Sequence, residues 1–138
     1  MKRQNRFLKD IQTTIPVVAA LALYFFVQPK IGPEIVVVFF ASWLAGYILD
    51  YTITAKNSHL LRFERNLVFP ALYKRFGIMI TLLIHFTMEA LIVLMIPVLF
   101  TYDFGLPASS VVALAFGVSH VMAYASNCKF VKKYNTSL

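Results

Sequence analysis

The stretch EIVVVFFASWLAGYILDYTITA, residues 34–55, decides the fold class of this chain. It is long enough to cross the hydrocarbon core of a bilayer, which takes about 20 mainly apolar residues. It also contains Asp50, and a carboxylate inside a bilayer is expensive unless it is paired, protonated or close to water. The stretch therefore predicts a membrane helix, and it predicts that another part of the chain accommodates the acid.

Three further windows are mainly apolar, at about residues 11–27, 77–100 and 108–127. The 138 residues are 59% hydrophobic and 14% charged, against roughly 25% charged residues in an average soluble domain. Turns containing proline and glycine, residues 28–34 and 101–110, join the windows in pairs. We expect one all-α transmembrane domain, residues 1–138, built as a four-helix bundle of two helical hairpins. The basic start before residues 11–27 also fits a signal peptide, but with Met1 present we expect an uncleaved first helix.

The basic residues are distributed unevenly over the expected loops. Twelve of the 13 precede the first helix, lie between the second and third helices, or follow the fourth; only Lys30 lies in the other two turns. Lysine and arginine favour the cytoplasmic side of membrane proteins. We therefore expect a multi-pass protein of the cell membrane with both termini cytoplasmic. The basic rim should attract anionic lipid headgroups, so the net charge of +7 does not indicate a nucleic acid partner.

The segment between the second and third windows, residues 56–76, alternates basic residues with Leu, Phe and Tyr. Such alternation is typical of an amphipathic segment at a membrane surface. We expect a short helix or an ordered loop on the cytoplasmic face. The lone cysteine, Cys128, rules out a disulfide within the chain.

Small residues recur at spacings of four on two of the expected helices. They are Ser42, Gly46, Asp50 and Thr54 on the second helix, and Ala113, Gly117, Ala115, Ser119 and Ala123 on the fourth. Small side chains let membrane helices approach closely, because lipid provides no hydrophobic drive between them. We expect these faces to pack inside the bundle.

Ionisable residues from three helices are expected at similar depth, at about 1.5 Å of rise per residue. They are Asp50 on the second helix, His85 and Glu89 on the third, and His120 on the fourth. With Glu64 as a further donor, this set would suit a divalent cation such as zinc, manganese or iron. It would equally suit a proton or cation pathway. Alternatively, these side chains only form hydrogen bonds between helices, at about 0.6 kcal/mol each.

A pattern of four polar residues, Asp50, Thr54, Glu64 and Asn66, follows the order D-x3-T-x9-E-x-N. It resembles the signature of an uncharacterised family of small prokaryotic membrane proteins with four helices. The family has proline where this chain has Leu67, and Asn127 corresponds to a late asparagine of the family. The resemblance implies a polar site at the cytoplasmic face of a prokaryotic plasma membrane protein, and no defined activity.

Three functions remain open from the sequence. The first is an accessory or structural subunit of a larger membrane complex, whose many aromatic side chains would pack on partner subunits. The second is a small ion or metal transporter that uses the intramembrane Asp, His and Glu residues. The third is a metal-dependent membrane enzyme, although no nucleophile motif, phosphate loop or H-E-x-x-H motif assigns a catalytic residue. We favour the first function.

Overall fold

The computed structural model describes residues 18–27, 30–59, 68–100 and 102–135, and within these ranges the secondary structure is helical, with no strand. A short helix, Val18–Val27, is followed by α2 (Pro33–Lys56), α3 (Val68–Leu99) and α4 (Tyr102–Asn135). The last three are each long and apolar enough to span a membrane. The predicted all-α class is therefore confirmed for the described residues, which contain four helices. Residues 11–17 of the expected first helix lie outside them.

The ends of α2 agree with the sequence to within one residue. Pro33 occupies the start of the helix, where its missing N–H removes no helical hydrogen bond. The carbonyl of Gly32 accepts from the backbone of Val36 at 3.1 Å. At the other end, the side-chain amide of Asn57 donates to the carbonyl of Ile53 at 2.8 Å, so this carbonyl of the last turn has a side-chain donor.

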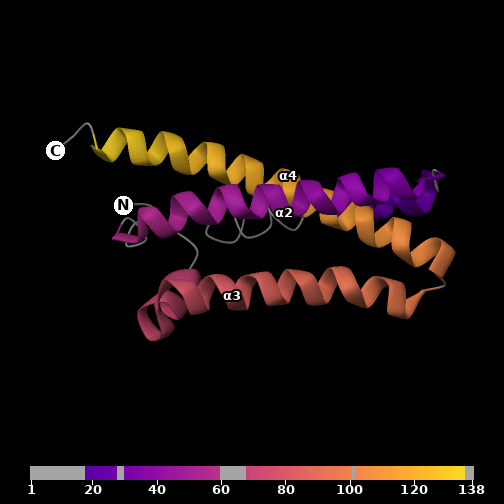
Figure 1. Cartoon of the computed structure of the whole chain (residues 1–138), viewed down its shortest axis with the longest axis horizontal. Helices are drawn as coiled ribbons and strands as arrows, with labels where there is room; N and C mark the ends of the chain where they lie inside the picture. The colour runs from indigo at the N-terminus through magenta and orange to yellow at the C-terminus, as the bar shows by residue number, and fades with distance from the viewer. Residues whose placement is uncertain (1–17, 28–29, 60–67, 101, 136–138) are drawn as a thin grey trace, which may run out of the picture.

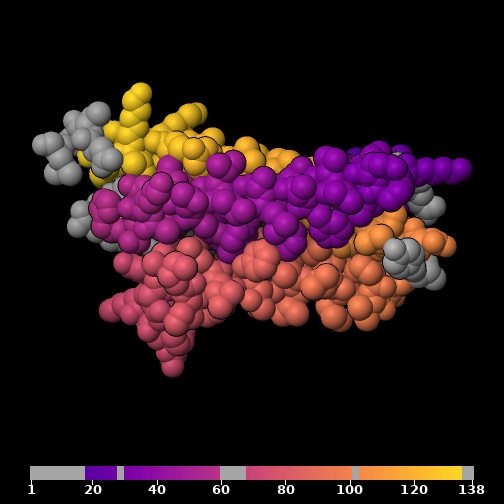
Figure 2. Space-filling model, viewed as in Figure 1, coloured from indigo at the N-terminus to yellow at the C-terminus, as the bar shows by residue number. Residues whose placement is uncertain are grey.

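Within α3, a sharp break occurs at the residue where the sequence predicted the helix to begin. Gly77 has φ 75° and ψ 173°, and a positive φ of this kind favours glycine because it has no Cβ. Residues 68–76 thus form a separate short helix, within the segment for which a short helix or ordered loop was expected. This start of α3 bends away from the rest of the bundle in Figures 1 and 2.

At its N-terminus, α4 is longer than predicted, because Tyr102 to Ser110 were expected to form a turn. Pro107 is accommodated near the helix start, where its ring removes one hydrogen bond, the one to the carbonyl of Asp103. Gly105 lies against α3: a Cβ at this position would be 2.7 Å from the Cα of Pro97. Glycine therefore serves close helix packing here and does not mark a turn. The helix also continues past residue 127 to Asn135.

Seen from the side, α2 and α4 run in the same direction next to each other, and α3 runs in the opposite direction (Figure 1). α2 and α4 approach each other closely at two glycines. A Cβ on Gly46 would lie 2.6 Å from the carbonyl oxygen of Gly117, and a Cβ on Gly117 would lie 2.8 Å from that of Ser42. The close packing predicted from the spacing of small residues is therefore present.

The end of the bundle near residues 97–105 is held by apolar packing and one unusual hydrogen bond. Pro97 has no N–H, so the carbonyl of Val93, four residues earlier, lacks its helical donor. The hydroxyl of Ser109 on α4 donates to that carbonyl at 2.7 Å. Tyr24 and Phe25 of the first helix pack against Phe104 there.

Candidate functional site

Four ionisable side chains from three helices meet inside the bundle. Asp50 belongs to α2, His85 and Glu89 to α3, and His120 to α4. We call these four residues the polar cluster. Asp50, Glu89 and His120 are only 8%, 6% and 7% exposed. The residues that the sequence singled out as a possible ligand set are thus brought together by the fold.

His120 lies between the two acids and contacts both. Its Nδ1 is 3.0 Å from Oδ2 of Asp50. Its Nε2 is 3.0 Å and 3.1 Å from the two carboxylate oxygens of Glu89. One imidazole ring on α4 therefore links α2 and α3.

The two contacts of the His120 ring constrain the number of protons that Asp50, Glu89 and His120 can share. A neutral imidazole carries one N–H, and an ionised carboxylate only accepts. Both contacts of His120 are hydrogen bonds only if an imidazolium donates from each nitrogen, or if a neutral ring donates once and one acid is protonated. In either form the three side chains together hold two of these protons. A neutral ring between two ionised acids would hold only one. Losing the second proton leaves two lone pairs facing each other.

Other side chains also donate to the two carboxylates. Trp43 Nε1 donates to Oε2 of Glu89 at 2.9 Å. The amide of Asn127 donates to Oδ1 of Asp50 at 2.9 Å and lies 3.4 Å from the hydroxyl of Thr54. Among the residues that the structure describes, no buried side-chain nitrogen or oxygen lacks a partner. This satisfaction is what makes the burial of two acids tolerable in apolar surroundings.

His85 is the member of the polar cluster nearest the surface. Its side chain is 44% exposed, and its Nδ1 lies 3.3 Å from Oε1 of Glu89. The same nitrogen is 2.5 Å from the hydroxyl of Tyr51 on α2. A continuous series of contacts therefore runs from half-exposed His85 through Glu89 and His120 to Asp50.

The polar cluster does not have the arrangement of a metal centre, although its residue types suit one. The two nitrogens of His120 face different carboxylates, so the acids lie on opposite sides of the ring. In the described ranges, no three His, Cys, Asp or Glu side chains are grouped so as to hold a metal ion. Binding of a divalent metal by Asp50, His85, Glu89 and His120 stays a prediction, and it would require these side chains to turn away from one another.

The structure describes two of the four residues of the D-x3-T-x9-E-x-N pattern, Asp50 and Thr54. Asp50 and Thr54 face the same side of α2, where Asn127 of α4 contacts both. This contact joins the first two residues of the pattern to the late asparagine associated with it. Glu64 and Asn66 lie outside the described residues.

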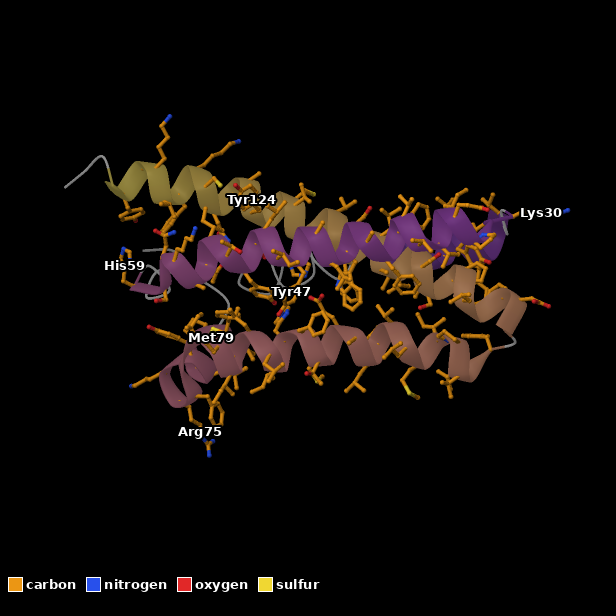
Figure 3. All side chains as sticks on the ribbon, viewed as in Figure 1. Lys30, Tyr47, His59, Arg75, Met79 and Tyr124 are labelled. Atoms are coloured by element: carbon orange, nitrogen blue, oxygen red, sulfur yellow. The ribbon has the colours of Figure 1, made fainter. Side chains whose placement is uncertain are left out.

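The sequence analysis did not assign Trp43, Tyr47 and Tyr51 to the site. Trp43 and Tyr51 contact Glu89 and His85, while the hydroxyl of Tyr47 donates to the carbonyl of Leu82 at 2.7 Å. Figure 3 shows Tyr47 between α2 and α3. A signal was present: the three aromatic residues follow each other at spacings of four, on the face that carries Asp50.

No protein-family model matches this chain, and no curated protein or solved structure matches it either. The resemblance based on Asp50, Thr54, Glu64 and Asn66 therefore stays a prediction.

Proposed function

We propose that this chain is a small multi-pass membrane protein that transports an ion in a process linked to proton binding, with Asp50, Glu89 and His120 as the proton site. The observation that carries the proposal is the position of His120, with one ring nitrogen on each of two acids from different helices. Ionisable residues inside a membrane are rare, and chains of Asp, Glu and His are typical of proton relays in pumps and transporters.

Proton binding at this site is linked to helix packing. The bound proton completes the hydrogen bond of His120 either to Asp50 on α2 or to Glu89 on α3. When it leaves, an acceptor faces an acceptor, and the contact becomes repulsive. Protonation thus favours the packed arrangement of three helices, and deprotonation favours their separation. A change of this kind is what a transporter needs to couple a proton to a second ion.

The membrane orientation that we propose places both termini and residues 56–76 on the cytoplasmic side of the plasma membrane. Its support is the distribution of basic residues, twelve of which fall on that side. Lys30, at the opposite end of the bundle, is the exception (Figure 3).

The test is proton flux into lipid vesicles that contain the purified protein and a pH-sensitive dye, driven by imposed gradients of sodium, potassium or chloride ions. We expect flux above that of protein-free vesicles, and we expect Glu89→Gln and His120→Gln to reduce it to the protein-free rate. The matched controls are Glu34→Gln and His59→Gln, which make the same chemical changes at exposed side chains. Both controls should keep the flux of the parent protein.

Flux in Glu89→Gln equal to that of the parent, in protein that remains folded, would contradict the proposal. A parent protein that gives no proton flux under any applied gradient would also contradict the proposal. In either case the polar cluster would serve only to hold the helices together.

An accessory subunit of a larger membrane complex is a second candidate, favoured by the apolar surface of α3. Large side chains along this helix are exposed, including Leu83, Leu91, Leu94 and Val98, and partner helices would cover them as well as lipid does. Purification in mild detergent tests this role. Other membrane chains should copurify with the protein, whereas a stable preparation of this chain alone would exclude it. The metal content of the same preparation tests the third candidate function, a metal-dependent membrane enzyme.

A further inference from the structure

His85 connects the polar cluster to the surface of the bundle. Its side chain is 44% exposed, whereas that of Glu89, one turn further along α3, is 8% exposed. Its Nδ1 contacts both Glu89 and the hydroxyl of Tyr51. None of the described residues forms a hydrogen bond with its Nε2. One nitrogen of the ring therefore contacts the buried acid, while the half-exposed side chain reaches the surface of the bundle.

The groups that face His85 come from each helix packed around it. Glu89 is the acid in contact with its ring, and Tyr51 of α2 is the hydroxyl in contact with it. The ring centroid of His120 on α4 lies 6.4 Å away, and that of Phe69, in the short helix before Gly77, lies 6.3 Å away. In the same short helix, Arg75 points away from the bundle (Figure 3). The titratable groups that the structure describes around His85 are thus Glu89, Tyr51 and His120.

We infer that His85 passes protons between the surface of the bundle and Glu89, and that Tyr51 is a positioning residue that holds the His85 ring during this transfer. The inference rests on the proposed function and assigns the route by which protons reach its site. A proton from water binds the lone pair of Nε2. The Nδ1–H bond then breaks, its electrons stay on nitrogen, and Oε1 of Glu89 gains the proton. The ring is left neutral, with its proton on Nε2.

Tyr51 is suited to both states of the ring because a phenol hydroxyl both donates and accepts. While Nδ1 carries a proton, the oxygen of Tyr51 accepts from it. After the transfer Nδ1 is bare, and the O–H of Tyr51 donates to it. The ring therefore keeps the hydroxyl of Tyr51 as a partner before and after the transfer, with Nδ1 3.3 Å from Oε1 of Glu89. Without this hydroxyl, we expect the ring to lose its fixed tautomer and orientation.

The first test is nitrogen-15 NMR of histidine-labelled protein in lipid bilayers, because the ring nitrogen shifts report tautomer and protonation directly. The three histidines are assigned with His59→Gln, His85→Gln and His120→Gln. We expect Tyr51→Phe to change the tautomer ratio of His85 across the pH range. Tyr24→Phe is the matched control: it removes the hydroxyl of a buried tyrosine at the other end of the bundle, where Tyr24 packs against Phe104. That variant should leave the signals of His85 unchanged.

The second test is proton flux in vesicles. We expect His85→Gln to be slower than the parent but faster than Glu89→Gln, because the proton site remains while its route to the surface is impaired. His59→Gln, at an exposed histidine of the same protein, should match the parent.

The two proposals fail in different ways. Parent flux that His85→Gln leaves unchanged would overturn the inference and leave the proposed function standing. Signals of His85 that are the same in Tyr51→Phe as in the parent would overturn the role of Tyr51. A parent protein without flux would contradict the proposed function, while the NMR result would still report whether Tyr51 sets the His85 tautomer.

Discussion

The contact between α2 and α4 and the contacts that hold α3 are built by different means. α2 and α4 meet backbone to backbone, where Gly46 and Gly117 leave no room for a side chain. α3 is joined to them by side-chain hydrogen bonds, above all those of Glu89 with Trp43 and His120. In lipid, both close packing of small residues and polar contacts stabilise helix pairs. Asp50 and His120 also join α2 to α4. Under the proposed function only the polar contacts respond to a proton, so we expect the attachment of α3, which lacks the Gly46–Gly117 contact, to be the most sensitive to protonation.

The largest effect should come from removing the acid that α3 shares with both other helices. Glu89→Ala deletes the acceptor of Trp43 and His120 and leaves their donors buried without a partner. We expect a loss of about 3–5 kcal/mol in the free energy of unfolding, as when one member of a buried charged pair is removed. The measurement is denaturant unfolding in detergent micelles. Glu34→Ala, at an exposed acid, is the control, and equal losses in the two variants would show that Glu89 does not hold α3.

A smaller loss should follow from breaking the contact between α2 and α4. In Gly117→Ala, the new Cβ would lie 2.8 Å from the carbonyl oxygen of Ser42 and 2.9 Å from the Cα of Trp43. Both are backbone atoms, so the helices must move apart, at about 1–3 kcal/mol for overpacking. Denaturant unfolding in detergent micelles again measures this loss of stability.

The control for this variant is Gly32→Ala, whose Cβ would meet only the flexible carboxylate of Glu34, at 3.1 Å. It should be close to the parent in stability. If Gly117→Ala is as stable as Gly32→Ala, the glycine contact does not limit the approach of α2 and α4.

The smallest effect concerns a single hydrogen bond between α3 and α4. Ser109→Ala leaves the buried carbonyl of Val93 without a donor, because Pro97 supplies none. We expect a loss of about 1–2 kcal/mol, the range for an unsatisfied buried acceptor. The bond would matter less in a Pro97→Ala background, since that substitution would restore the helical N–H. A double-mutant cycle measures this coupling.

Ser119→Ala is the matched control for the serine substitution. Its hydroxyl donates to the carbonyl of Ala115 in its own helix, and that carbonyl keeps a backbone donor. A cycle in which Ser109→Ala costs the same in the parent and in the Pro97→Ala background would show that the proline is not the reason for the bond.

Much of the fold could be predicted from residue patterns, since helix length and apolar content are local properties. Residues 34–55 correspond closely to α2, and the spacing of Gly46 and Gly117 indicated a close approach. The N-terminal end of α4 could not be predicted in this way. Gly105 and Pro107 are turn formers by their local preference, and only the packing of Gly105 on Pro97 shows why the helix continues through them.

The candidate site was predicted in part for a similar reason. Asp50, His85, Glu89 and His120 are conspicuous because ionisable side chains are costly in an apolar helix. Which nitrogen faces which acid depends on how three helices rotate against one another, and no local pattern encodes that rotation. Trp43 and Tyr51 were missed because aromatic residues in a membrane helix also suit lipid and the membrane interface.

The sequence by itself determined that this chain is built of apolar helices with acids and histidines embedded in them, because composition and periodicity follow from the order of residues alone. Only the tertiary structure decided that His120 stands between Asp50 and Glu89, with half-exposed His85 as the outer end of the cluster. The reason is geometric. A hydrogen bond requires two atoms within about 3 Å of each other, and atoms on separate helices reach that distance only when the helices are packed in one register.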